Sequence, residues 1–371
     1  MTDAETRDRL RLARTDGVGP VTFGKLLRRF ASAAEAIAAL PAMARTAGRE
    51  TPPRIPSAGD ANRELDRLSK LGGRMLVLGG PDYPPMLALL DTPPPVLSVL
   101  GDVAVLQRRA VALVGARNAS ANGQRMAEIL AADLALAGLV VVSGMARGID
   151  AAAHVGALRT GQTVAAVAGG IDVAYPAENT DLQQAVAEGG AVVAEAPFGT
   201  APQARHFPRR NRIIAGLSLG VVVVEAAPRS GSLITARMAQ DMGRELFAVP
   251  GSPLDPRCRG SNDLIRAGAH LTESAADVVA NLPDQPGPAA ASASLGLGFS
   301  DEAEPLADPV SVRSQVLALL GPTPTPVDDL VRRCQLSASA VIAALLDLEL
   351  AERVEMLPGN QACLIAHGDA A

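Results

Sequence analysis

The sequence predicts an α/β protein. It is built on an extended Rossmann-like, doubly wound and mostly parallel sheet, with a small helical N-terminal domain and a C-terminal winged-helix domain. Between residues 76 and 282, short apolar runs alternate with Ala-rich or amphipathic stretches, and each run ends in glycine or an acid. Continuous apolar strands that alternate with helices are typical of a parallel sheet covered on both faces. The runs are VALVG (111–115), LVVVSG (139–144), TVAAVAGG (163–170), AVVAEA (191–196), GVVVVEA (220–226) and LFAVPG (246–251).

The rest of the chain divides into three further segments. Residues 1–75 have apolar side chains at helical spacing, and they predict a SAM or helix-hairpin-helix-like domain. Residues 283–308 are low in complexity and predict a flexible linker. Within 309–371, three short helical stretches precede RVEML and ACLIA, which can pair as a hairpin, and this order resembles a winged helix. The GVG at 17–19 is either a helix-hairpin-helix turn, whose amides touch a DNA phosphate, or a plain tight turn.

Composition limits the classes of protein to be considered. The chain has 371 residues, which suggests more than one core, and its 48% of apolar residues are enough to fill them. The three cysteines have no metal-like or disulfide-like spacing, and the charged N-terminal stretch is unlike a signal peptide. No apolar run reaches the length that spans a bilayer. We expect a cytoplasmic protein that does not contact membranes.

Glycine, serine and arginine residues stand where the predicted strands end. Ligands of a doubly wound sheet bind beyond the carboxyl ends of its strands, and amides at a glycine-containing helix start bind anions. Each loop alone is explained equally well as a tight turn. The convergence of several arginines on one sheet edge instead favours a ligand with several phosphates. These loop residues are Gly115, Arg117, Ser143, Gly144, Arg147, Gly148, Ser230, Gly231 and Ser232.

A further cluster of arginines lies in ARHFPRRNRIIAGLS (204–218), which places four of them within eight positions of a chain whose net charge is -5. Residues 107–282 contain 16 basic and 15 acidic residues, so the positive charge is local. Arginine forks suit phosphate groups. We expect this cluster to form the rim of a phosphate pocket at the start of a helix.

Other chemistries have little support. Neither a Walker A motif nor GxGxxG with its downstream acid is present, which argues against ATPase and dinucleotide-binding functions. The four histidines are scattered, and the loop serines have no identifiable base. Asp150 and His154 are interpreted as a helix-capping acid and a partly buried histidine, and Glu195 and Glu225 as partners that orient arginines. We therefore expect no cofactor, no metal and no catalytic residue.

Five segments together resemble the bacterial DNA-processing protein family DprA, also called Smf. They are VALVGARNAS, VVSGMARGIDAAAH, TVAAVAGGIDVAYPAEN, HFPRRNRIIAGLS and VVVVEAAPRSGSLITARMA with LFAVPG. The resemblance covers roughly residues 75–282, and the two terminal regions resemble the family's terminal domains. It implies a single-stranded DNA-binding protein that protects incoming DNA and loads the RecA recombinase in natural transformation or recombination. It also implies a homodimer formed through the Rossmann domain.

The resemblance assigns phosphate-contacting positions to Arg117 and Arg147. After the YP of AYPAEN the family often has a basic residue, but Ala177 and Glu178 follow here, so that contact is missing or moved to Arg205. Phe207 is nearly the only candidate for base stacking, because aromatic residues are 2% of the chain. We expect affinity to depend mainly on phosphates and to fall steeply with salt. Together, the loops and the resemblance predict a nucleic-acid site formed by Gly115, Arg117, Ser143, Gly144, Arg147, Gly148, Arg205, Phe207, Arg210, Asn211, Arg212, Ser230, Gly231, Ser232 and Thr235.

Two other functions are alternatives to single-stranded DNA binding. A Rossmann-type nucleotide phosphoribohydrolase would pair Arg147 with Glu195 or Glu225, but the PGGxGTxxE stretch of that group is missing. A winged-helix transcription factor is disfavoured, since residues 308–366 contain 4 Arg and 7 acidic residues. The would-be recognition helix SASAVIAALLDLEL has no basic residue, whereas a DNA reader needs a basic face. We expect the C-terminal domain to contact protein or to regulate.

Overall fold

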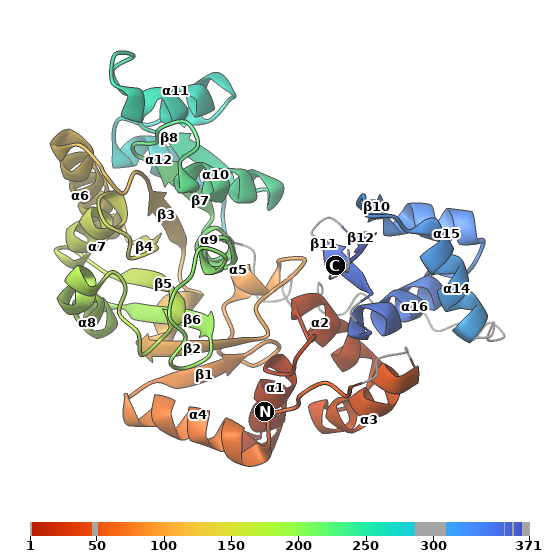
Figure 1. Ribbon diagram of the computed structural model, residues 1–371. Helices are drawn as coiled ribbons and strands as arrows, with labels where there is room; N and C mark the ends of the chain where they lie inside the picture. The colour runs from red at the N-terminus through yellow and green to blue at the C-terminus, as the bar shows by residue number, and fades with distance from the viewer. Residues whose placement is uncertain (1, 47–50, 286–308, 352, 358–359, 366–371) are drawn as a thin grey trace, which may run out of the picture. The chain divides into compact units, whose positions relative to one another are not determined.

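The computed structural model describes residues 2–46, 51–285, 309–351, 353–357 and 360–365 (Figure 1). Its contacts divide the chain into two compact units. One unit comprises Met1–Arg63, Asp91–Pro95 and Gly296–Ala371, and the other Glu64–Leu90 and Val96–Leu295. Most of the expected linker, residues 286–308, lies outside the described residues, and the four predicted segment boundaries stay a prediction.

The second unit is built on a nine-stranded sheet in the order β1-β2-β6-β5-β4-β3-β7-β8-β9. Strands β3 to β9 run parallel, whereas β2 pairs antiparallel with β6 and β1 antiparallel with β2. The strands are β1 (Arg74–Val77), β2 (Val96–Gly101), β3 (Ala110–Val114), β4 (Val140–Ser143), β5 (Thr163–Gly170), β6 (Ala191–Ala196), β7 (Gly220–Val223), β8 (Glu245–Ala248) and β9 (His270–Leu271). The predicted mostly parallel sheet is confirmed, and all six apolar runs are strands. The antiparallel edge and the two-residue β9 were not predicted.

Helices cover both faces of this sheet, as the apolar runs require. Successive side chains of β3 alternate between two cores: Ala112 and Val114 face one, and Val111 and Leu113 face the other. The first face is covered by α5 (Pro85–Ala88), α9 (His206–Leu217), α10 (Gly231–Asp241) and α11 (Arg259–Arg266). The second is covered by α4 (Ala58–Lys70), α6 (Ala121–Leu136), α7 (Ile149–Leu158), α8 (Thr180–Gly189) and α12 (Ala275–Asn281).

The strand order reverses at β3, which pairs with β4 on one side and with β7 on the other. The chain leaves β3 through α6, on one face of the sheet, and leaves β7 through α10, on the opposite face. The loops that follow β3 and β7 therefore diverge to opposite faces at the carboxyl ends of these strands. Ligands of this fold class bind at that position. The predicted site residues lie on the loops around this position.

The first unit contains a helical N-terminal part and a winged helix. Among the described residues, no helix is both long and apolar enough to cross a bilayer. The N-terminal helices are α1 (Asp3–Ala13), α2 (Pro20–Arg29) and α3 (Ala33–Thr46). The winged helix comprises α14 (Pro309–Leu319), β10 (Thr325–Pro326), α15 (Val327–Cys334), α16 (Ala338–Leu350), β11 (Val354–Leu357) and β12 (Gln361–Leu364). The three predicted C-terminal helices and the predicted hairpin are confirmed.

Candidate nucleic-acid interface

The loop after β3 presents the first predicted arginine to solvent. A Cβ at Gly115 would lie 2.5 Å from Cγ1 of Ile149, so glycine allows β3 and the start of α7 to approach closely. Ser120 ends the loop as the N-cap of α6, where its hydroxyl accepts a first-turn amide hydrogen bond at 2.9 Å. Arg117 stands between these two anchored ends and is exposed, with its guanidinium carbon 4.8 Å from the centre of the Phe207 ring.

Buried residues of the loop after β4 connect it to the neighbouring strand and loop. Ser143 is buried, and its hydroxyl donates to the carbonyl of Leu113 on β3 at 2.6 Å. Gly148 has a φ of 72°, and a Cβ there would lie 2.4 Å from the carbonyl oxygen of Ala116. Gly144 is buried as well. Ser143 and Gly144 therefore hold the loops together below the surface, and their role as direct phosphate ligands stays a prediction.

Arg210 lies inside the protein and not on the expected rim. Its side chain is on the first half of α9, and the residue is only 5% exposed. The guanidinium donates to the carbonyl oxygens of Gly144 and, at 2.9 Å, of Ala166. Burial lowers the pKa of Arg210 to about 10, which leaves it charged at neutral pH. Asn211, 8% exposed, is buried beside it. Arg210 thus bonds to the loop after β4 and to β5, and both residues lie below the rim on which they were expected.

Asp150 is the counter-charge of Arg210 and not the helix cap that we expected. The N-cap of α7 is Gly148, which makes no side-chain capping bond, and Asp150 lies in the first turn. Its carboxylate accepts from the amide of Ala146 at 3.4 Å. Burial raises the pKa of Asp150, and the charge of Arg210 opposes that rise. The pair keeps an arginine charged under the surface of the site.

The two glutamates that end strands both engage arginines, as expected. Arg212 is half-buried, and its Nη2 lies 2.6 Å from Oε1 of Glu195. Glu225 is buried, accepts from the amide and the hydroxyl of Ser120 at 3.0 Å each, and lies 3.3 Å from Nε of Arg257. Glu195 thus orients one of the predicted arginines. Glu225 orients Arg257, which the sequence analysis did not select.

Three exposed or half-exposed side chains, two from loops and one from the first turn of α9, meet at the carboxyl edge of the sheet. We call them the aromatic platform: Arg117, Tyr175 and Phe207. The ring centres of Tyr175 and Phe207 are 5.9 Å apart, and Arg117 lies over the Phe207 ring. Tyr175 is 48% exposed. It was missed as a site residue, although its position in AYPAEN, in the loop that follows β5, could have indicated it.

Two further arginines near this edge are exposed, but they differ in their partners. Nε of Arg147 lies 2.5 Å from Oε1 of Glu178, the acid that stands where the family often has a basic residue. The charge of Arg147 is therefore compensated locally. Arg205 is exposed at the N-cap position of α9, and its Nε lies 3.4 Å from Nε2 of His206. Arg205 adds positive charge where the first turn of α9 has no acid.

The start of α10 follows β7. Ser230 is the N-cap, and its hydroxyl accepts from the amide of Ser232 at 3.4 Å. Ser232 and Thr235 are buried, whereas Gly231 is exposed and a Cβ there would have nothing within 4 Å. The predicted helix start is confirmed, and Gly231 is the residue of this group that a phosphate can approach freely.

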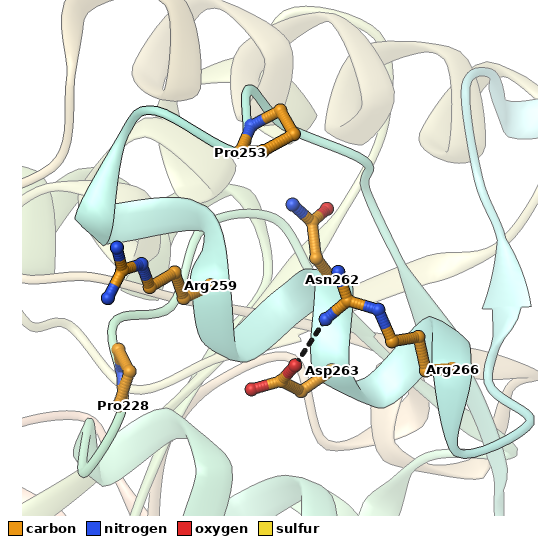
Figure 2. Close-up of a pocket in the computed structure, with 6 residues that line it drawn as sticks. All are labelled: Pro228, Pro253, Arg259, Asn262, Asp263 and Arg266. Carbon is orange, nitrogen blue, oxygen red and sulfur yellow. Dashed lines mark hydrogen bonds and ion pairs between the residues drawn. The ribbon is translucent and has the colours of Figure 1, made fainter.

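A pocket of about 360 Å³ lies beside the β7–α10 loop, where Pro228 faces the first turns of α11 (Figure 2). Its other lining residues include Arg259 and Arg266, which the sequence analysis did not select. Arg266 pairs with Asp263 at 2.5 Å. The side chain of Asn262 both donates to and accepts from the backbone of Gly251. The pocket is therefore built around structural hydrogen bonds, with Arg259 exposed at its edge.

His154 is fully buried, deeper than expected, and it is neutral. Its Nδ1 lies 2.7 Å from the Thr163 hydroxyl, which itself donates to the carbonyl of Val141 at 2.7 Å. Nδ1 therefore carries the proton and donates, and Nε2 has no hydrogen-bond partner. Burial, with a smaller contribution from the charge of Arg210, lowers the pKa of His154 to about 3.

This histidine should make the protein sensitive to acid. Its pKa is about 6.5 in the unfolded chain and about 3 in the folded protein. The free energy of unfolding is therefore unaffected by this histidine above pH 6.5, and it decreases as the pH falls below that value because the unfolded chain binds the proton. Each pH unit in that window lowers the free energy of unfolding by about 1.4 kcal/mol. We expect urea unfolding of the native protein to lose about 2–3 kcal/mol more than that of His154→Gln between about pH 6.5 and 4.5. Equal pH slopes would contradict this.

In the part of the chain that the structure describes, Ser143, His154 and one acidic cluster have structural partners. Ser143 uses its hydroxyl to donate to a backbone carbonyl, and His154 bonds to Thr163, so neither belongs to a nucleophile–base pair. Among the described residues, Glu225, Asp255 and Cys258 place ligand atoms within 4.8 Å of one another. Arg257 ion-pairs with both of those carboxylates, at 3.3 and 2.8 Å.

Three profiles of one protein family match most of the chain. Residues 74–283 match the family profile of DNA recombination-mediator protein A. Residues 3–66 match the DprA-like N-terminal HHH domain, and residues 300–360 match the DprA winged helix domain. Protein Smf of Escherichia coli (strain K12) is 38% identical over 287 residues, which cover 75% of this chain and 74% of that protein.

Other relatives extend this similarity to solved structures. DNA processing protein DprA of Bacillus subtilis (strain 168) is 40% identical over 235 residues, 63% of this chain and 77% of that protein. The structure of DNA processing protein A from Streptococcus pneumoniae aligns with a TM-score of 0.65 and 33% identity, covering 77% of this chain and 99% of that one. DNA processing protein A from Helicobacter pylori, described for its single-stranded DNA binding mode, aligns with a TM-score of 0.51 and 29% identity, covering 56% and 94%.

Proposed function

Since the chain belongs to the DNA recombination-mediator protein A (DprA) family, we propose that it binds single-stranded DNA at the carboxyl edge of its sheet and delivers the RecA recombinase onto that strand. The observation that carries the proposal is the aromatic platform, where Arg117 lies over Phe207 and Tyr175 stands beside it. Stacking of a base on an aromatic ring contributes about 1–3 kcal/mol, and an arginine beside the ring can reach the adjoining phosphate.

The predicted site residues divide into two roles under this proposal. Six of them, each exposed or half-buried, contact the strand: Arg117, Arg147, Gly148, Arg205, Phe207 and Gly231. The others hold the loops in place from below: Gly115, Ser143, Gly144, Arg210, Asn211, Arg212, Ser230, Ser232 and Thr235. A flexible strand can place successive phosphates and bases into such separate positions, whereas a stiff duplex cannot bend into them. The protein acts as a mediator and has no catalytic role.

Two protomers joined through the Rossmann domain would place two such sites on one strand. Linked sites raise the overall affinity without any new contact, because the second binding event becomes intramolecular. This matters for a site with two rings, in which the charge of the nearby Arg147 is already compensated by Glu178. The proposal therefore includes a homodimer.

The test is fluorescence anisotropy with a labelled oligothymidine and with a duplex of equal length, each at two salt concentrations. We expect the single strand to bind at least about tenfold more tightly, with an affinity that falls steeply as salt rises. Equal affinity for the two probes would overturn single-strand selectivity. An affinity independent of salt would overturn the phosphate contacts. Loading is tested separately, by the rate at which RecA displaces a single-strand-binding protein from the same oligonucleotide.

A further inference from the structure

Helix α16 occupies the recognition position of the winged helix, yet its polar side chains are acidic. Asp347 and Glu349 are on its last turns, and the side chain of Glu349 is only 15% exposed. Acidic groups in this position would repel the phosphates of a duplex. Their burial calls for a cationic partner, because a buried charge without a partner is strongly unfavourable.

The partner lies in the N-terminal helical part of the same unit. Nζ of Lys25 on α2 is 4.0 Å from Oε2 of Glu349, and the Lys25 side chain is 9% exposed. One turn further along α2, Nη1 of Arg29 is 3.9 Å from Oδ1 of Asp347. Two cations of α2 thus approach two acids of α16, and Asp347 also accepts a hydrogen bond from Nη1 of Arg313 on α14 at 3.3 Å. Burial lowers the pKa of Lys25 and raises that of Glu349, as expected for a pair removed from water.

Apolar packing supports the ion pairs. Leu346, adjacent to these acids, is 3% exposed and belongs to the core formed by Phe23, Leu26 and Leu40 of the N-terminal helices. Its neighbour Leu345 belongs instead to the core of the winged helix. Helix α16 therefore has two buried faces, one for its own domain and one for the N-terminal helices.

We propose that the winged helix is an intramolecular docking module whose partner is the chain's own N-terminal helical domain. The surface that a DNA-reading winged helix would place in a groove is here covered by α2 and α3. The acids of α16 take the place that phosphates would occupy beside the cations of α2. The domain then joins the two ends of the chain and does not read duplex DNA.

The test is a charge-reversal cycle in the full-length protein, read by hydrogen–deuterium exchange of peptides from α2 and α16. Lys25→Glu and Glu349→Lys should each speed exchange in both helices by at least about tenfold, because each places like charges together. The double variant Lys25→Glu/Glu349→Lys should return both helices to within about threefold of the native rate. Peptides from β3 and β4 should not change in any variant.

Arg45→Glu is the control, since Arg45 is an exposed arginine at the end of α3 in the same unit. It should leave exchange in α16 unaltered. Two results would overturn the proposal: Lys25→Glu speeding exchange in α2 while α16 stays native, or a double variant no better protected than the single ones. The outcome does not depend on whether the other unit binds DNA.

Discussion

Replacement of Arg210 by methionine should lower the free energy of unfolding by about 3–5 kcal/mol, the usual result of leaving a buried charge without its counter-charge. The variant leaves Asp150 buried without its cation, and it removes the donor that the carbonyls of Gly144 and Ala166 share. Methionine fills a similar volume, so the loss reports the missing charge and hydrogen bonds more than a cavity. Urea unfolding at neutral pH measures the change.

Arg209→Met is the control for this variant, because Arg209 is exposed and adjacent in the same helix. It should change the free energy of unfolding by less than about 0.5 kcal/mol. The double variant Arg210→Met/Asp150→Asn should recover part of the loss, since it removes the uncompensated buried carboxylate. A loss below about 1 kcal/mol for Arg210→Met would show that Arg210 is not the buried anchor described here.

Arg117→Glu should weaken oligothymidine binding about 10- to 100-fold, because a charged hydrogen bond to phosphate contributes about 1.5–3 kcal/mol and each 1.4 kcal/mol is a factor of ten. The slope of log affinity against log salt should fall by about 0.7, the value for one phosphate of a single strand. Fluorescence anisotropy across a salt series measures both effects. Arg117 packs on Phe207 and stands in an anchored loop, so stability should change little.

Arg159→Glu makes the same change in charge at the opposite end of the sheet, since Arg159 ends α7 whereas the site lies at its start. Arg159 forms an ion pair at the surface with Glu128 on α6. The DNA affinity of Arg159→Glu should stay within about twofold of the native value. If Arg117→Glu and Arg159→Glu weaken binding equally, the effect is one of net charge, and the aromatic platform is not the site.

Much of the fold follows from local patterns. Each apolar run that ends in glycine or an acid became a parallel strand, because side chains buried on both faces must be apolar along the whole strand. The winged helix followed from three helical stretches and a hairpin. The antiparallel strands β1 and β2 and the short β9 were not found, since they are stabilised by pairing with a sheet that already exists and carry little pattern of their own.

The position of the site was predicted, but not which of its residues are exposed and which are buried. The sequence by itself determined that loops with glycine and arginine would gather at the carboxyl edge. The succession of strands along the chain and the composition of the loops are local properties, and parallel pairing brings the carboxyl ends of the strands to one edge. Only the tertiary structure decided which arginine faces water. Arg117 and Arg210 look alike in sequence, yet one lies over a ring in solvent and the other donates to Gly144, a residue distant in the chain. Burial and pairing depend on such distant neighbours, and no periodicity in the chain encodes them.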